Sequence, residues 1–336
     1  MMSTNPFLPF PEVEDVLPIV IPLPGSDLVT LNIYAVGAGP ITLIDTGLKI
    51  PGALEYIRQR LRSAGFDLGD IERIIVTHGH QDHFGLTVAM RKEAGRHIPC
   101  FIHEDDRWRV ASENYQEGFW TGEMAHFMAM ADMPQTEVQK VKDRFVFLRE
   151  LCDPLDEVSV MRDGDVFTGD GYHLTVIHTP GHTTGNCCLY ESRRCILFSG
   201  DHIIKHITPN PLMEIKRTYL RDPNYRSLKT YLLSLDKLRD VEARFVFPGH
   251  GEYIEDLPGI VAGYVVHHRE RMDSVWQALR KESRPLYQLI GDVFPFVPEG
   301  DAFLAISELL VHIEILLEEG RVELVDSGPP IMFKAM

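Results

Sequence analysis

The stretch that decides the fold is Thr77-His78-Gly79-His80-Gln81-Asp82-His83-Phe84-Gly85, which directly follows the apolar run Ile74-Ile75-Val76. The apolar run has the length and the β-branched composition of a buried strand, so the polar residues are expected where a strand ends and the chain turns outward. In an extended backbone, His78 and His80 point to the same side. Because neutral imidazole and carboxylate are common metal ligands, the stretch predicts a metal-binding loop.

The composition is that of a globular protein and argues against a polyanionic or membrane partner. Of the 336 residues, 44% are hydrophobic and 24% are charged, and the formal charge is −16. Such a negative charge disfavours general attraction to nucleic acid or anionic lipid. No apolar run approaches the roughly 20 residues that cross a bilayer, and the N-terminus lacks a basic segment followed by an apolar one. The five cysteines form no C-x-x-C pair, which fits a reducing compartment, so a cytoplasmic location is expected.

Outward from the histidine-rich loop, strand-like and helical segments alternate. Runs rich in β-branched and aromatic residues predict strands at residues 16–21, 28–36, 41–44, 98–102, 158–161, 165–168, 172–178, 186–190, 195–198 and 244–247. Apolar residues at helical spacing predict helices at 51–65 and 84–94, and another that follows Leu220-Arg221-Asp222-Pro223 and runs to Leu238. This alternation favours a layered fold whose strand ends carry the chemistry.

Three later strands end in the same way as the strand before His78. Each stops at a Gly-flanked loop, and these loops carry His182, Asp201 and His250. Glycine allows the close backbone approach that a tight metal site needs. An earlier strand ends in Asp45-Thr46-Gly47, a weaker signal that a turn-capping aspartate would also explain. The nitrogen and oxygen ligands that result exceed the needs of one tetrahedral zinc and suit two adjacent metals: His78, His80, Asp82, His83, His182, Asp201 and His250.

This set of residues resembles the metallo-β-lactamase superfamily, whose signature H-x-H-x-D-H stands here as residues 78–83. The resemblance covers about Val16 to Glu255 and implies an α+β fold, the αββα sandwich of two facing mixed sheets with helices outside and metals at one edge. It also implies that one metal is bound by His78, His80 and His182 and the other by Asp82, His83 and His250. Asp201 would bridge the two metals, and Asp45 would hydrogen-bond to the histidine loop and orient it.

The resemblance implies two divalent metal ions, with zinc as the first expectation and iron or manganese as alternatives, because histidine and aspartate accept all three. A metal-bridging hydroxide would be the nucleophile, and Asp82 and Asp201 would act in catalysis as metal ligands. True zinc β-lactamases carry cysteine near the position of Asp201. Aspartate there resembles hydroxyacylglutathione hydrolases, lactonases and phosphodiesterases, so antibiotic hydrolysis is not expected.

We expect a metallo-β-lactamase-like domain at residues 1–256, with a helical insertion at about 104–162, and a C-terminal domain at 257–336. The insertion carries large soft side chains, which either pack it onto the body or line a substrate pocket as a lid: Trp108, Tyr115, Phe119, Trp120, Met124, Phe127, Met128, Met130 and Met133. In the C-terminal domain, helical segments (261–282, 286–293 and 303–319) and a closing hairpin resemble a winged helix. His267 and His268 are expected on a helix surface.

Winged helices often bind nucleic acid, but from Ile260 onward seven Lys/Arg stand against twelve Asp/Glu, a formal balance of −5. A domain that grips phosphates normally shows a basic face, so a packing or dimerisation role is favoured. The first hypothesis is therefore a dinuclear hydrolase of a small ester, thioester or lactone. A phosphodiesterase or ribonuclease is the alternative, and an iron dioxygenase of the persulfide type is the second alternative. A small-molecule substrate is expected; nucleic acid and a homodimer are left open.

Overall fold

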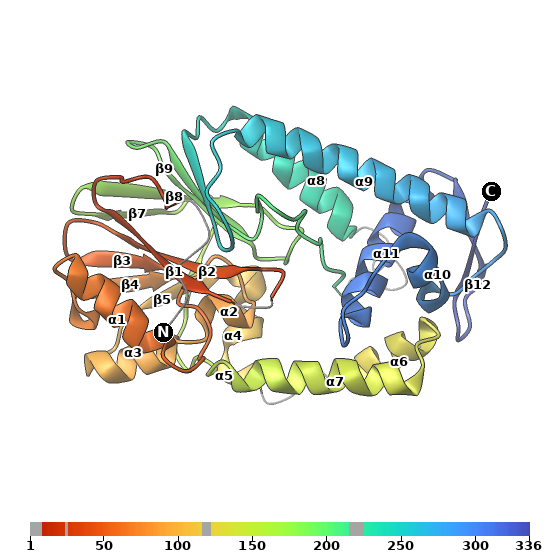
Figure 1. Cartoon of the computed structure of the whole chain (residues 1–336), viewed down its shortest axis with the longest axis horizontal. Helices are drawn as coiled ribbons and strands as arrows, with labels where there is room; N and C mark the ends of the chain where they lie inside the picture. Colours follow the sequence, from red (N-terminus) through yellow and green to blue (C-terminus); the bar gives the residue numbers. More distant parts are fainter. Residues whose placement is uncertain (1–8, 24–25, 116–121, 215–224) are drawn as a thin grey trace. The chain divides into compact units, whose positions relative to one another are not determined.

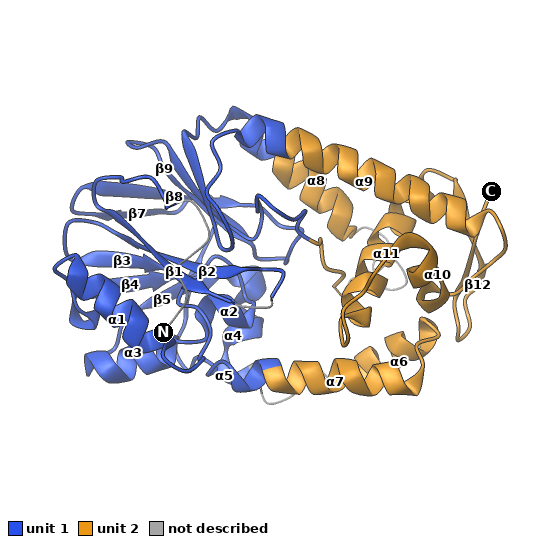
Figure 2. Ribbon diagram, in the orientation of Figure 1, with its two compact units in different colours: residues 1–116, 148–209, 237–260 blue, residues 117–147, 210–236, 261–336 orange. Residues whose placement is uncertain are grey.

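The computed structural model describes residues 9–23, 26–115, 122–214 and 225–336 (Figure 1). It consists of two compact units (Figure 2). Unit 1 contains two clusters of buried hydrophobic residues and unit 2 contains one. Unit 1 comprises residues 1–116, 148–209 and 237–260, and unit 2 comprises residues 117–147, 210–236 and 261–336. Part of the expected insertion thus groups with the C-terminal residues, and the domain boundary expected at 256/257 stays a prediction.

Unit 1 contains two mixed sheets. The first runs in the order β1 (Val16–Pro22), β2 (Thr30–Val36), β3 (Ile41–Ile44), β4 (Ile71–Ile75), β5 (Cys100–His103) and β6 (Ser159–Met161), antiparallel up to β3 and parallel beyond it. The second runs in the order β11 (Phe245–Pro248), β10 (Ile196–Gly200), β9 (Cys187–Glu191), β8 (Tyr172–His178) and β7 (Val166–Gly169). In this sheet β10 and β11 pair in parallel, and the other described pairs are antiparallel.

Period-2 alternation along the strands explains how the layers of unit 1 pack. On β2, Leu31 and Ile33 belong to the core that contains residues of α1 (Ala53–Ser63) and α3 (Thr87–Ala94), whereas Tyr34 belongs to the core shared with the second sheet. Tyr34 stacks on Phe247 of β11 with ring centroids 5.4 Å apart. Because side chains alternate between the two faces of a strand, one sheet contributes to both cores. The α+β sandwich expected from the sequence is confirmed.

The helix expected at 84–94 is wrong in one respect, because the chain forms two helices, α2 (Gln81–Phe84) and α3, separated by Gly85 and Leu86. The backbone N–H and the hydroxyl of Thr46 both donate to the His83 carbonyl, at 2.7 and 3.2 Å. In a continuous helix this carbonyl would accept the Thr87 N–H, and the Leu86 N–H would bond to the Asp82 carbonyl but donates instead to Thr46 Oγ1 at 3.3 Å. The competing bonds from Thr46 therefore account for the break, and α2 stays beside the strand ends.

Two short helices, α4 (Arg107–Val110) and α5 (Ser112–Tyr115), follow β5 in unit 1. In its described residues, unit 2 is helical apart from one hairpin. Its elements are α6 (Gly122–Met130), most of α7 (Gln135–Glu150), α8 (Ser227–Lys237) and α9 (Leu257–Leu279), then α10 (Leu286–Val293), α11 (Ala302–Glu318), β12 (Val322–Asp326) and β13 (Met332–Ala335).

Five soft side chains of the expected insertion lie in the core of unit 2: Met124, Phe127, Met128, Met130 and Met133. Packing therefore accounts for them. Trp108, in unit 1, is 41% exposed. The Tyr115 side chain, Phe119 and Trp120, like the segment 220–223, lie outside what the structure describes.

The expectation that His268 lies on a helix surface is wrong. His268 on α9 is buried, and its Nδ1 lies 3.1 Å from Nε2 of His312 on α11. Burial lowers the pKa of His268 to about 2 and that of His312 to about 3, so both rings stay neutral inside unit 2.

Among the described residues, no helix has the length and apolarity needed to cross a bilayer.

Candidate metal centre

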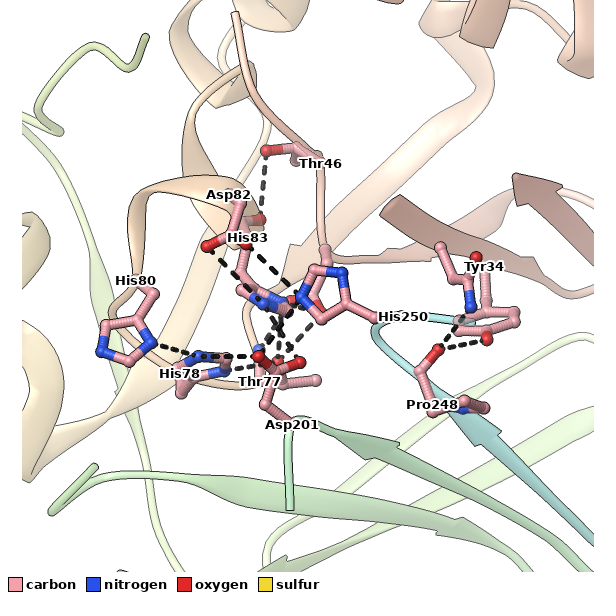
Figure 3. A network of polar contacts seen from close by, with 12 residues as sticks. Tyr34, Thr46, Thr77, His78, His80, Asp82, His83, Asp201, Pro248 and His250 are labelled. Atoms are coloured by element: carbon pink, nitrogen blue, oxygen red, sulfur yellow. Dashed lines mark hydrogen bonds and ion pairs between the residues drawn. The ribbon is translucent and has the colours of Figure 1, made fainter. Parts of the chain in front are cut away.

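The structure brings all seven candidate ligands together at the ends of strands of unit 1. Figure 3 shows six of them: His78, His80, Asp82, His83, Asp201 and His250. The loop after β4 and the short helix α2 supply His78, His80, Asp82 and His83. The β8–β9 loop supplies His182, and Asp201 and His250 follow the ends of β10 and β11. Because β3, β4 and β5 are parallel, as are β10 and β11, strand ends from both sheets meet at one edge.

The first group of ligand atoms consists of three imidazole nitrogens. His80 Nδ1 lies 2.9 Å from His78 Nε2 and 3.1 Å from His182 Nε2. Burial and the neighbouring His182 ring lower the pKa of His80 to about 3, and burial also holds the pKa of His78 well below its ordinary value. The rings of His78 and His80 are therefore neutral, with lone pairs available. Three converging imidazole nitrogens are a donor set suited to a divalent cation.

The second group combines two imidazoles with two carboxylates. His250 Nε2 lies 3.4 Å from Asp82 Oδ2 and 3.2 Å from Asp201 Oδ2. His83 Nε2 lies 3.4 Å from Asp201 Oδ1 and 3.8 Å from Asp82 Oδ1. Asp201 also faces the first group, since its Oδ2 lies 3.7 Å from His182 Nε2. Asp201 is thus the carboxylate between the two groups.

Asp45 orients two of these histidines from behind. Its Oδ2 accepts the Nδ1–H of His83 at 2.8 Å and the Thr77 hydroxyl at 2.9 Å, and its Oδ1 accepts the Thr77 backbone N–H at 2.8 Å. The Thr77 hydroxyl oxygen in turn lies 3.2 Å from His78 Nδ1. When the Nδ1 side of a histidine is held in this way, its Nε2 is directed to the ligand. Asp45 therefore has the contacts expected of a residue that orients the histidine loop.

Backbone contacts complete this orientation. The Nδ1–H of His250 donates to the Thr30 carbonyl at 2.6 Å, which turns its Nε2 toward the two aspartates. A Cβ on Gly249 would stand 2.5 Å from Asp201 Oδ1 and 2.8 Å from His83 Cε1. Only glycine lets the chain after β11 come this close. This close approach explains why a glycine precedes His250 in the sequence.

Polar atoms at the centre fit a cation. His83 Nε2, His250 Nε2 and Asp201 Oδ1 are all buried, and although they lie at ion-pair distance from one another or from neighbouring carboxylates, they make no hydrogen bond among the described residues. A buried polar atom left unsatisfied costs about 1–3 kcal/mol, so three such atoms facing one another call for a common ligand. The histidine and carboxylate donors that surround them are those that zinc, iron and manganese accept. The residues present fit divalent metal binding.

One buried carboxylate at the site was not singled out from the sequence. Asp106 ends the 3-10 turn Glu104–Asp106 that follows β5, and its Oδ2 accepts the backbone N–H of Gly79 at 2.8 Å. It falls within the segment expected to be an insertion, where it looked like one acid among several. The signal that could have found it is its place, because it follows the end of a parallel strand adjacent to β4.

The sandwich fold and the clustered histidines and aspartates define a metal-dependent hydrolase. The chain belongs to the metallo-beta-lactamase superfamily, whose sequence profile matches residues 26–250. It is 26% identical over 326 residues to the probable metallo-hydrolase YqjP of Bacillus subtilis, covering 96% of this chain and 98% of that protein. It is 24% identical over 279 residues to the atrochrysone carboxyl ACP thioesterase dmxR1 of a Cryptosporiopsis species, covering 81% of this chain and 66% of that protein.

A solved structure agrees with this assignment. The crystal structure of a metallo-beta-lactamase family protein from Thermus thermophilus matches with a TM-score of 0.79 at 26% identity, covering 96% of this chain and 99% of that one. A beta-lactamase domain protein from Burkholderia ambifaria matches with a TM-score of 0.80 at 19% identity, covering 97% of this chain and 94% of that one, which shows the shared fold. Both matches extend over nearly the whole chain and so include residues outside 26–250.

Metal binding is expected to release protons and to tighten as the pH rises. Burial opposes a charge on His250, but the carboxylates of Asp201 and Asp82 raise its pKa to about 10. At neutral pH a proton therefore stands on the nitrogen that a metal needs, and raising the pH lowers the cost of removing it. Between pH 6 and pH 8, the zinc affinity should rise roughly tenfold per pH unit for each proton displaced.

Chelator competition at several pH values measures this slope, and calorimetry in buffers of different ionisation enthalpy counts the protons. The exposed His97, which pairs with Glu157 at the surface, supplies the control. His97→Gln should release as many protons as the unmodified chain. A zinc affinity that does not change with pH would contradict the expectation.

Proposed function

We propose that this protein is a dinuclear metal-dependent hydrolase of a small thioester, ester or lactone. The observation that carries the proposal is the position of Asp201, whose two oxygens face histidines of both groups at 3.2–3.7 Å. A shared carboxylate between two sets of ligands is the arrangement of a two-metal site. Zinc is the first candidate, with iron and manganese as alternatives.

In this proposal each of the two ligand groups binds one metal ion. His78, His80 and His182 would hold one ion, and Asp82, His83 and His250 the other, with Asp201 contacting both. Two divalent ions, when bound, supply an activated water at neutral pH and a Lewis acid for the substrate oxygen. Asp45 and the Thr30 carbonyl keep the rings of His83 and His250 turned toward the ions.

Burial of the candidate ligands strengthens their electrostatic interactions. His78 and His250 are fully buried and Asp201 is nearly so. In such surroundings a fixed charge acts on a reacting group far more strongly than it would in water. Asp82 and Asp201 would take part in catalysis as ligands that set the charge of the centre. The rings of His83 and His250 are already held by hydrogen bonds to Asp45 and to the Thr30 carbonyl, so little reorganisation of these two residues is needed on substrate binding.

The substrate class rests on three supports. A protein named as a carboxyl ACP thioesterase is among the relatives of this chain. Aspartate at position 201 resembles the pattern of hydroxyacylglutathione hydrolases, lactonases and phosphodiesterases, and so favours these classes over antibiotic hydrolysis. The formal charge of −16, together with −5 from Ile260 onward, disfavours the phosphodiesterase or ribonuclease alternative. The test still includes this alternative, because the C-terminal residues resemble a winged helix in sequence and winged helices often bind nucleic acid.

The test is a parallel substrate screen on the metal-loaded protein. The panel contains an acyl thioester, an aryl ester, a lactone, a phosphodiester reporter and a single-stranded RNA. We expect turnover of one of the first three, its loss on chelation and its return when metal is added back. Turnover confined to the phosphodiester and RNA would reverse the proposed substrate class.

Two variants and a metal count complete the test. His80→Ala should abolish the turnover found, while His97→Ala, at the surface, should leave it unchanged. Metal analysis of purified protein should find about two equivalents per chain for a two-metal site. Less than about half an equivalent after reloading would count against a metal centre altogether.

A further inference from the structure

Asp106 is a buried carboxylate that belongs to neither group of candidate ligands. It is 0% exposed, yet it lies beside the first group. A buried carboxylate is costly unless hydrogen bonds and a counter-charge compensate it. The hydrogen-bond donors around Asp106 therefore indicate its structural role.

Five donors from three segments surround its two oxygens. Oδ2 accepts the backbone N–H of Gly79 at 2.8 Å and the Thr183 hydroxyl at 2.6 Å. Oδ1 accepts the backbone N–H of Gly185 at 3.0 Å and, at the longer distance of 3.4 Å, the Thr184 hydroxyl. Arg109 Nε, at 3.2 Å from Oδ1, balances the charge. Apart from Arg109, each of these donors belongs to a ligand-bearing loop.

These loops are the two that carry the histidines of the first group. Gly79 stands between His78 and His80, and Thr183 follows His182. One loop follows β4 of the first sheet and the other joins β8 to β9 of the second. The same carboxylate oxygen is hydrogen-bonded to both loops. Asp106 therefore links the two segments whose separation sets the distance between His182 and the pair His78 and His80.

Packing reinforces this link. A Cβ on Gly79 would stand 2.7 Å from Arg109 Cβ, and a Cβ on Gly185 would stand 2.6 Å from Asp106 Cβ. Both ligand loops thus press directly on the Asp106–Arg109 pair at glycine positions. Rotation of either loop away from its present position would break its bonds to Asp106.

Asp106 and Asp45 differ in which group they support. Asp45 accepts directly from His83, a member of the second group, and holds His78 only through Thr77. Asp106 bonds to the two loops that carry the first group. Partners behind metal ligands typically contribute about ten- to hundredfold to metal affinity. Asp106 would then act on the first metal alone, while Asp45 would act on the second directly and on the first through Thr77.

We propose that Asp106 is a positioning residue that holds the histidines of the first group at their spacing, so that its loss weakens metal binding there and not at the second group. This inference rests on the proposed metal centre. Asp106→Asn keeps the shape but presents an amide N–H₂ to a site whose neighbours are donors. One of its two oxygens is lost as an acceptor. With the amide nitrogen in place of Oδ2 the bonds to Gly79 and Thr183 are lost, and in place of Oδ1 those to Gly185 and Arg109 are lost.

The matched control is Glu191→Gln. Glu191 at the end of β9 is also a 0% exposed carboxylate, and it accepts the backbone N–H of Arg194 at 2.8 Å and of His173 at 3.3 Å. These bonds do not reach the ligand loops. A second pair of variants acts on one bond only: Thr183→Val removes the hydroxyl donor to Asp106, and Thr183→Ser keeps it.

The experiment is a zinc titration of the metal-free full chain, followed by calorimetry and by chelator competition. Asp106→Asn should lower the affinity for one of the two bound zinc ions about ten- to hundredfold. Thr183→Val should lower the affinity for the same zinc ion by a smaller factor. Thr183→Ser and Glu191→Gln should bind zinc with the affinity of the unmodified chain. Thermal unfolding of the metal-free variants reports the purely structural cost of each change.

Two backgrounds identify the equivalent that is affected. With His250→Ala, only the first group is complete, and Asp106→Asn should still weaken binding. With His182→Ala, the same change should have no further effect on the remaining equivalent, as expected for a cycle between coupled sites. Weakening in both backgrounds, or an equal loss in Glu191→Gln, would overturn the inference.

A failure of the two-metal proposal can be told apart from a failure of this one. If the unmodified chain binds a single equivalent, the dinuclear proposal fails. Asp106 is then judged in the His250→Ala background alone, where unchanged affinity on Asp106→Asn refutes its role. If Asp106→Asn does not fold, the comparison of Thr183→Val with Thr183→Ser decides, and equal zinc affinities of these two variants would refute it.

Discussion

Asp201→Asn is expected to reduce kcat/KM by about 10³-fold or more, since a metal centre supplies several kcal/mol of transition-state stabilisation. The carboxylate faces both sets of ligands, with Oδ1 3.4 Å from His83 Nε2 and Oδ2 3.7 Å from His182 Nε2. Asparagine keeps the shape but removes the charge and replaces one oxygen with a donor. A donor directed at a cation is repelled, so at least one metal should be lost or displaced.

The measurement is kcat/KM on the best substrate of the screen, together with the metal content of the same preparation. Asp163→Asn is the control, because Asp163 is an exposed carboxylate outside the seven candidate ligands, and it accepts the backbone N–H of His178 at 2.7 Å. It should retain activity and metal. If Asp201→Asn kept its metal content and lost less than about tenfold in kcat/KM, the bridging role of Asp201 would be refuted.

Asp45→Ala is expected to cost about 3–5 kcal/mol of unfolding free energy, the range for breaking a buried charged pair by removing one partner. The change leaves His83 Nδ1–H and the Thr77 N–H buried without their acceptor. Asp45 also has a φ of 61°. Aspartate tolerates this left-handed conformation, whereas alanine there adds roughly 1 kcal/mol of strain.

Asp45→Asn separates the two effects. Asparagine accepts the left-handed backbone as readily as aspartate and still offers one oxygen to Thr77, so its stability loss should be clearly smaller. Its metal affinity should still fall, because the negative charge behind His83 is gone. Urea unfolding of the metal-free and metal-loaded proteins measures both quantities. Equal stability of the alanine variant and the unmodified chain would rule out this role for Asp45.

Much of unit 1 was predictable because local patterns govern it. The strand 41–44 was predicted with the bounds that the structure shows, since a short β-branched run between turn residues has few alternatives. The helix 84–94 was wrong only at its start, because Thr46, distant in sequence, accepts the Leu86 N–H and donates to the His83 carbonyl. His268 was misplaced because the polarity of the residue says nothing of the face of α9 on which it falls. In both cases a partner distant in the chain decided the outcome.

By itself, the sequence determined which side chains can serve as ligands and that they stand at strand ends, because ligand chemistry depends on residue type and strand ends on local periodicity. The strength of that prediction came from four strand ends of one kind. Only the tertiary structure decided which carboxylates support them. Asp45 could be anticipated from its strand end, but the bonds of Asp106 go to backbone N–H groups and hydroxyls of two loops. Every residue except proline has a backbone N–H, so the sequence carries no mark of which ones a buried carboxylate will meet.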